Sequence, residues 1–216
     1  MNKINYQNEL DKIIEKNKRE DKTPSLLLHS CCAPCSSYTI EYLSKYFDIT
    51  VLYYNPNISS SEEYEKRANE LKRLVSLMQF KNPVKVQILP FTPEDYNDIK
   101  KLRQNDREGG EACFKCYKLR LEKTAKTAKS QGFDYFTTTL SISPLKNSQK
   151  LNEIGKKLAE EYKVNYLFSD FKKKDGFKRS VILSEKYSLY RQNYCGCEFS
   201  KKEARLREKN CDSALT

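Results

Sequence analysis

The stretch SLLLHSCCAPC, residues 25–35, decides the fold. Its first part, Ser25–His29, is a short apolar run that follows the helix-breaking pair Thr23-Pro24, and this predicts a β-strand. Pro34 then stands where proline suits the first turn of a helix. A strand, a loop and a helix in this order predict the first unit of an α/β sheet, with three cysteines in or next to the loop.

The same alternation continues along the chain. Further strands are predicted at 48–54, 84–89, 136–140 and 164–168. Ser60 and Glu63 have the spacing of a capping box, and a helix from Cys113 to Gln131 is ended by Gly132. We therefore expect a Rossmann-like α/β fold, with a mostly parallel five-stranded sheet, helices on both faces and a helical C-terminal extension.

The chain has 216 residues, which suits one main domain with an appendage. We expect an N-terminal helix at 1–22, a Rossmann-like core at 23–171 and a helical extension at 172–216 that carries the CxC motif. No run approaches the roughly 18 apolar residues of a membrane span, and the N-terminus is charged rather than signal-like. These features predict a soluble, cytoplasmic protein with no membrane association.

The composition is strongly basic. Forty Lys and Arg against 29 Asp and Glu give a net charge of +11, which attracts polyanions over long range. Nucleic acid is the expected partner, although a basic surface that only solvates the protein is the alternative.

Cysteines are abundant and clustered. Seven of the eight fall at 31–35, 113–116 and 195–197, whereas Cys211 stands alone near the terminus. The reducing cytosol disfavours a disulfide framework, so metal or redox chemistry is the better expectation.

Open α/β sheets bind ligands beyond the carboxyl ends of their strands. The segments that follow the predicted strands, at 29–35, 53–57, 137–143 and 169–170, therefore converge with their polar and sulfur-bearing residues on one edge of the sheet.

Cys113 and Cys116 share one helix face with Arg120, so both thiols can bind one metal site. Positive charge from Arg120 and the lysines at 115 and 118 is expected to lower their pKa. Two thiols from the first loop complete a four-thiolate set for zinc or a [4Fe–4S] cluster. Spacing alone does not decide between them, but pairs some eighty residues apart and the surplus thiols favour the cluster.

Three further residues or motifs leave alternatives open. Cys195 and Cys197 can close only a strained, easily reduced ring, so they form either a redox-active pair or ligands of a second metal. His29, the single histidine, suits proton transfer or a buried hydrogen-bonded role. Asp170 suits proton donation, metal binding or helix capping.

Six ordered motifs resemble the cobalamin-independent epoxyqueuosine reductases. They are HSCCAPC at 29–35, YNPNI at 54–58 with the following EEYEKR, CFKCYKLRL at 113–121, FTTTLSISPLKN at 136–147, SDFKKKDGFKRS at 169–180 and YRQNYCGCEFS at 190–200. The resemblance covers nearly the whole chain from His29 to Ser200, and no motif cysteine is missing.

The resemblance implies a specific reaction and site. It implies a [4Fe–4S] cluster on Cys31, Cys32, Cys113 and Cys116, and a redox-active catalytic pair at Cys195 and Cys197. It also implies a second adjacent iron, for which Cys35 and Asp170 are candidate ligands. The implied substrate is tRNA carrying epoxyqueuosine, whose epoxide becomes a cyclopentene with release of water, and an unidentified donor supplies the electrons. Lysines and arginines at 115, 118, 172–174 and 205 are expected to hold phosphates.

Two other functions fit parts of the sequence. A cluster-dependent tRNA thiolation enzyme shares the α/β domain and paired cysteines, but it needs a glycine-rich ATP loop where this chain has HSCCAPC. A noncatalytic, zinc-stabilised RNA-binding module is the other alternative, and it would lack the brown colour of an iron–sulfur protein.

Overall fold

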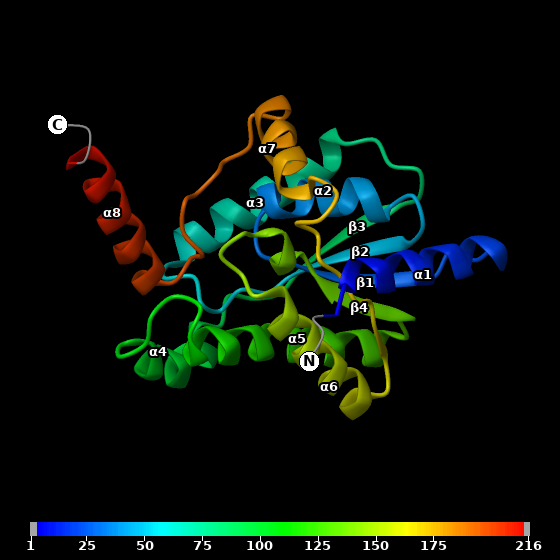
Figure 1. Ribbon diagram of the computed structural model, residues 1–216, viewed down its shortest axis with the longest axis horizontal. Helices are drawn as coiled ribbons and strands as arrows, with labels where there is room; N and C mark the ends of the chain where they lie inside the picture. Colours follow the sequence, from blue (N-terminus) through cyan, green and yellow to red (C-terminus); the bar gives the residue numbers. More distant parts are fainter. Residues whose placement is uncertain (1–3, 214–216) are drawn as a thin grey trace.

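The computed structural model describes residues 4–213, with side chains for residues 4–210. Strands and helices alternate along the chain (Figure 1) in the order α1 (Tyr6–Arg19), β1 (Ser25–Ser30), α2 (Ala33–Leu43), β2 (Asp48–Tyr53), α3 (Ser61–Leu77), β3 (Val84–Ile88), α4 (Asn97–Arg103), α5 (Glu111–Gln131), β4 (Tyr135–Thr138), α6 (Ser148–Tyr162), β5 (Asn165–Tyr166), α7 (Gly176–Lys186) and α8 (Glu198–Ser213). Short 3₁₀ turns occur at Pro93–Tyr96 and Thr139–Ile142. None of the described helices is long and apolar enough to cross a membrane.

The five strands form one parallel sheet in the order β3-β2-β1-β4-β5. The chain runs outward from β1 to β3 and then returns to place β4 on the other side of β1. Leu28 is thus paired with Val51 of β2 and Thr137 of β4. The topological switch point, where such sheets bind ligands, lies between β1 and β4. The predicted α/β fold is confirmed.

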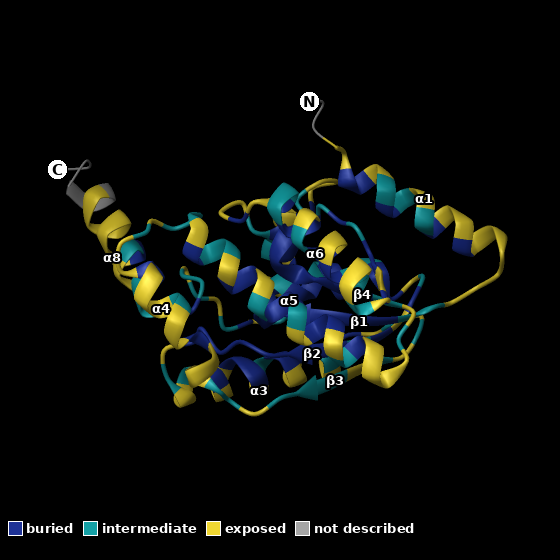
Figure 2. Cartoon of the chain, turned by 90° about the horizontal axis from the view of Figure 1, so that it is seen from below, coloured by how far each residue is buried: buried dark blue, intermediate teal, exposed yellow. Residues whose placement is uncertain are grey.

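The sheet is covered on both faces, which explains why β1 is apolar along most of its length. Leu26 and Leu28 pack into the layer formed with α2 and α3, whereas Leu27 points to the opposite layer formed with α5 and α6. All three leucines are fully buried. Figure 2 shows this buried centre between the exposed outer faces of the helices. Truncating one of these leucines to alanine would cost about 2–5 kcal/mol.

Several element boundaries differ from the prediction, three of them by two residues. β4 ends at Thr138 because the Thr138 hydroxyl accepts a hydrogen bond from Leu140 N at 3.2 Å and opens a 3₁₀ turn. β5 is only two residues long. Beyond Leu167 the backbone bonds to a side chain instead of to a neighbouring strand, because Ser169 N donates to Asn152 Oδ1 at 3.0 Å. α5 begins two residues before Cys113, which places the cysteines in its first turns.

The C-terminal extension contains two helices with different surroundings. α7 packs against α2 and is held by an ion pair of 2.6 Å between Arg179 and Glu41. α8 lies at one end of the molecule (Figure 1) and is tied to the body by Arg103 and Glu203, 2.6 Å apart. The predicted division of the chain at residues 22 and 171 stays a prediction.

Candidate active site

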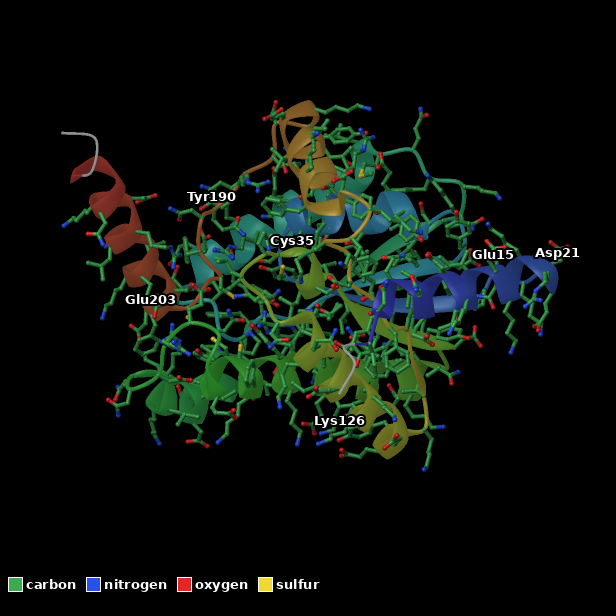
Figure 3. The ribbon with its side chains drawn as sticks, in the orientation of Figure 1. Glu15, Asp21, Cys35, Lys126, Tyr190 and Glu203 are labelled. Atoms are coloured by element: carbon green, nitrogen blue, oxygen red, sulfur yellow. The ribbon has the colours of Figure 1, made fainter. Side chains whose placement is uncertain are left out.

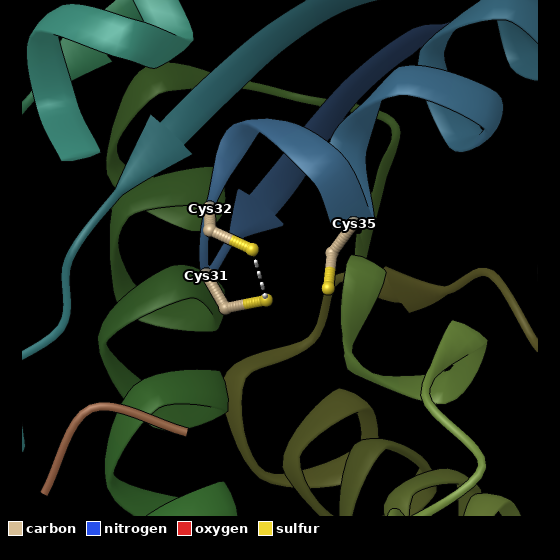
Figure 4. Close-up of side chains that lie close together, drawn as sticks. All are labelled: Cys31, Cys32 and Cys35. Carbon is tan, nitrogen blue, oxygen red and sulfur yellow. Dashed lines mark hydrogen bonds between the residues drawn. The ribbon is translucent and has the colours of Figure 1, made fainter. Parts of the chain in front are cut away.

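Three cysteines meet at the carboxyl end of β1. Cys31 and Cys32 follow the strand directly, and Cys35 lies in the first turn of α2. Their sulfur atoms all lie within 4.8 Å of one another, with 3.8 Å between Cys31 Sγ and Cys32 Sγ (Figure 4). Cys31 and Cys32 are buried, and Cys35 is half-buried near the middle of the molecule (Figure 3). The structure therefore brings Cys35, a candidate ligand of the second metal, next to Cys31 and Cys32.

The close spacing of this group makes it suited to a metal. Hydrogen bonds from the thiols of Cys31 and Cys35 hold the pKa of Cys32 well below its usual value, helped by the charge of Arg67. Hydrogen bonds with Cys31 and Cys32 raise the pKa of Cys35 well above its usual value. A tetrahedral metal with bonds of about 2.3 Å places its sulfur ligands about 3.8 Å apart, close to the observed separation.

The remaining described cysteines come from α5 and from the segment before α8. Cys113, Cys116, Cys195 and Cys197 line one narrow cavity of about 10 Å³. Cys31, Cys32, Cys35 and Cys195 line an adjoining cavity of about 400 Å³. Glu108, Lys146 and Cys195 line both. Seven thiols from three distant segments thus surround two adjoining spaces, while the Cys211 side chain lies outside the described residues.

The expected low pKa of Cys113 and Cys116 is wrong for the protein without metal. Burial raises the pKa of Cys116 to about 12 and also raises that of Cys113. Arg120 acts in the opposite direction on Cys116 but is outweighed, and Lys115 and Lys118 face solvent. A metal that binds here must therefore displace protons from these thiols.

Cys195 has the opposite character. Burial opposes its ionisation, but the charges of Lys146 and Arg120 prevail and hold the pKa of its thiol below the usual value. Cys195 and Cys197 are both free thiols, and within residues 4–210 no disulfide is formed. Cys195 is also the member of the CxC motif that borders both cavities.

The CxC loop is fixed to the body of the protein by its backbone. Gly196 adopts φ +131°, a conformation that suits glycine, and its carbonyl accepts a hydrogen bond from Ser59 N at 3.2 Å. Arg67 Nη1 donates to the carbonyl of Cys195 at 3.2 Å, and the same guanidinium is paired with Glu63 at 2.7 Å. These contacts tie the loop to α3.

His29 is fully buried with both ring nitrogens occupied. Nε2 lies 3.1 Å from the carbonyl oxygen of Tyr54, so it carries the proton, and Nδ1 accepts from the Thr138 hydroxyl at 2.8 Å. Burial lowers the pKa of His29 to about 4. Of the two sequence-based interpretations, these contacts support the buried, hydrogen-bonded one.

Asp170 does not reach the thiols. Its carboxylate accepts a hydrogen bond from Ser148 at 3.0 Å, in the first turn of α6, and lies 3.3 Å from Lys172 Nζ. It is absent from the described residues that line either cavity. Asp170 does not cap α6 either, because Asn147 is the N-cap residue of that helix and Asp170 accepts only from the Ser148 hydroxyl.

Three buried cations of the site, Lys146, Arg67 and Arg103, were not predicted. Lys146 is 7% exposed and pairs with Glu108 at 3.3 Å, and Arg67 is 1% exposed beside the first thiol group. Lys146 lies in the segment that follows β4, at the edge where such sheets bind ligands, so its position in the sequence could have marked it as a site residue. Arg67 lies four residues after Glu63 on α3, a spacing too common to single it out.

A family model and several known proteins match this chain over most of its length, and all of them carry the same name. The family model described as Epoxyqueuosine reductase QueH matches residues 26–203. A protein of that name from Streptococcus pyogenes serotype M1 is 43% identical over 204 residues, covering 93% of this chain and 79% of its own length. Proteins of the same name from Staphylococcus epidermidis (41% identical, covering 92% and 85%) and Thermotoga maritima (35% identical, covering 84% and 92%) also match.

Proposed function

The chain belongs to the epoxyqueuosine reductase QueH family, and on that premise we propose that it reduces epoxyqueuosine with a [4Fe–4S] cluster and a redox-active cysteine pair. The enzyme is an oxidoreductase whose substrate is the epoxyqueuosine base of tRNA, and it forms queuosine. We place the reaction in the cytoplasm, with an electron donor still to be identified. The observation that carries the proposal is the gathering of seven cysteines around two adjoining cavities.

The proposed cluster ligands are Cys31, Cys32, Cys113 and Cys116. Two of these come from the end of β1 and two from the first turns of α5, so they approach the switch point from different elements. The surroundings suit an anionic metal–thiolate group, since buried hydrogen-bond donors of Arg103, Tyr117 and Arg120 lack partners among residues 4–210. When bound, such a cluster supplies one-electron redox chemistry. A second adjacent iron belongs to the proposal, with Cys35 as its candidate ligand.

The CxC pair balances the reaction. Removal of the epoxide oxygen breaks two C–O bonds, forms a C=C bond and releases water, which takes two electrons and two protons. Oxidation of the Cys195 and Cys197 thiols to a disulfide delivers two electrons and two protons. The external donor must then return two electrons to the disulfide, and two protons from solvent restore both thiols.

The larger cavity is the proposed binding site for the modified base. Its volume of about 400 Å³ falls in the range typical of small-molecule pockets, and Cys195 and Lys146 line it. Enzymes that act on a base draw it out of the stack into such a pocket. The buried ammonium of Lys146 is placed to stabilise negative charge that develops on the epoxide oxygen.

Basic residues around the site are the proposed phosphate contacts. Lys115, Lys118, Lys173 and Arg205 are exposed. Lys172 and Lys174 are already engaged, the first with Asp170 at 3.3 Å and the second with Asp11 at 2.8 Å. The four exposed residues are therefore the better candidates for contacts with tRNA.

Anaerobic purification followed by iron and sulfide analysis tests the cluster. We expect a brown protein with about four iron and four sulfide per chain, and loss of both in the double variant Cys113→Ser/Cys116→Ser, because a hydroxyl is a poor substitute for a thiolate. Stoichiometric iron and sulfide in that folded variant would remove the pair from the ligand set. A colourless wild-type protein that holds only zinc would instead favour the RNA-binding module.

A further inference from the structure

Arg120 carries a buried charge that meets no carboxylate among residues 4–210. Its side chain is 1% exposed, and Nε donates to the carbonyl of Cys116 at 3.2 Å. Nη1 and Nη2 are both buried and have no hydrogen-bond partner among residues 4–210. A guanidinium cannot lose its proton to escape this environment, so the arrangement is costly unless an anion lies beside it.

The other buried arginines of the described chain are paired. Arg67 lies 2.7 Å from Glu63, and Arg103 lies 2.6 Å from Glu203. Arg103 lines the same narrow cavity as Arg120. The two arginines therefore share a location, but only Arg103 has a carboxylate partner among residues 4–210. The contrast sets Arg120 apart as the buried arginine that has no carboxylate partner among residues 4–210.

Cysteine sulfur atoms line the cavity beside Arg120. Arg120 is four residues after Cys116 on α5, on the same helix face, and it lines the cavity together with the thiols of α5 and the CxC motif. Burial opposes the charge of Arg120, but the sulfurs of Cys116, Cys195 and Cys31 outweigh it and raise the pKa of the guanidinium. The side chain therefore shares its cavity with the thiols of α5 and of the CxC motif.

We infer that Arg120 is a positioning residue of the metal centre, whose two Nη groups donate N–H···S hydrogen bonds to its sulfur atoms and offset its negative charge. This inference rests on the proposed function, since it requires an anionic cluster at these cysteines. Hydrogen bonds and positive charge at the sulfurs favour the reduced, more negative state of a cluster and raise its reduction potential. The planar fork of arginine can serve two sulfur atoms at once, which a lysine ammonium does less well.

The test is a redox titration of the loaded protein, followed by the spectrum of the reduced cluster. At a fixed potential, Arg120→Met is expected to lower the ratio of reduced to oxidised cluster at least tenfold, a shift of about 59 mV for a one-electron couple. Arg120→Lys keeps the charge but loses the fork, so its ratio should fall between those of wild type and Arg120→Met. Arg179→Met is the control, expected to change the ratio less than threefold because Arg179 lines neither cavity and Glu41 already offsets the charge that it removes.

Two outcomes would overturn the inference. One is a wild-type potential in Arg120→Met, and the other is an equal shift in Arg179→Met. If Arg120→Met does not retain the cluster, Arg120→Lys decides, because a wild-type potential there would rule out the forked hydrogen bonds. Absence of iron and sulfide from the wild-type protein would instead contradict the proposed function, so the two failures are distinguishable.

Discussion

Replacement of Gly196 by alanine should displace the CxC pair while sparing the rest of the fold. At φ +131° a residue with a Cβ is strained by about 1–3 kcal/mol. The added Cβ would also lie 3.0 Å from Ile58 Cγ1, 3.2 Å from Asn57 Nδ2 and 3.3 Å from Arg67 Nη1, so these neighbours must give way. For a chain of this size, each kcal/mol lowers Tm by about 2–4 °C, which predicts a fall of roughly 2–12 °C.

The functional effect should exceed the loss of stability. A misplacement of about 1 Å at a reacting group can cost about a hundredfold in rate, so we expect at least a tenfold loss of multiple turnover with the cluster iron retained. Gly132→Ala is the matched control: Gly132 also has positive φ (+73°), but it ends α5 before β4, at the sheet edge opposite the cysteines, and no described atom lies within 4 Å of the new Cβ. It should lose stability and keep its activity. Equal turnover in the two variants, measured at a temperature where both are folded, would refute the role assigned to the Gly196 turn.

Two further predictions concern the surface and the C-terminal helix. The affinity for substrate tRNA should fall with salt, with a log–log slope of about −0.7 to −0.9 per phosphate contact; equal turnover of free nucleoside and intact tRNA at low concentration would show that the basic surface is incidental. Glu203→Gln should lower the free energy of unfolding by roughly 1–3 kcal/mol in urea titration, because it leaves the buried Arg103 unpaired while Glu203 itself is partly exposed. An unchanged urea midpoint would mean that this ion pair does not stabilise α8.

The sequence predicted the sheet better than the interior of the site. Apolar runs such as Leu26–Leu28 are local signals, and the rule that ligands bind beyond strand ends was enough to bring the cysteines to one edge. The strand ends were less predictable, because β4 and β5 end where the side chains of Thr138 and Asn152 take over backbone hydrogen bonds.

The charge environment of the thiols could not be read from neighbours in the sequence. Lys115 and Lys118 lie close to Cys113 and Cys116 in the chain but point to solvent. Burial, which depends on tertiary packing, decides the pKa of Cys116. The cations that do reach the sulfurs are Arg120 of α5 itself and two from other elements, Lys146 from the loop after β4 and Arg67 from α3.

The most direct test of the account is multiple turnover of epoxyqueuosine tRNA by Cys195→Ser, measured together with its iron content. If Cys31, Cys32, Cys113 and Cys116 complete the cluster, the variant should keep its brown chromophore and its affinity for tRNA. It should lose multiple turnover, because a single thiol cannot cycle through an intramolecular disulfide. Loss of cluster iron would make Cys195 a ligand, and full turnover would show that the cysteine pair is not the source of electrons; either result would contradict the account.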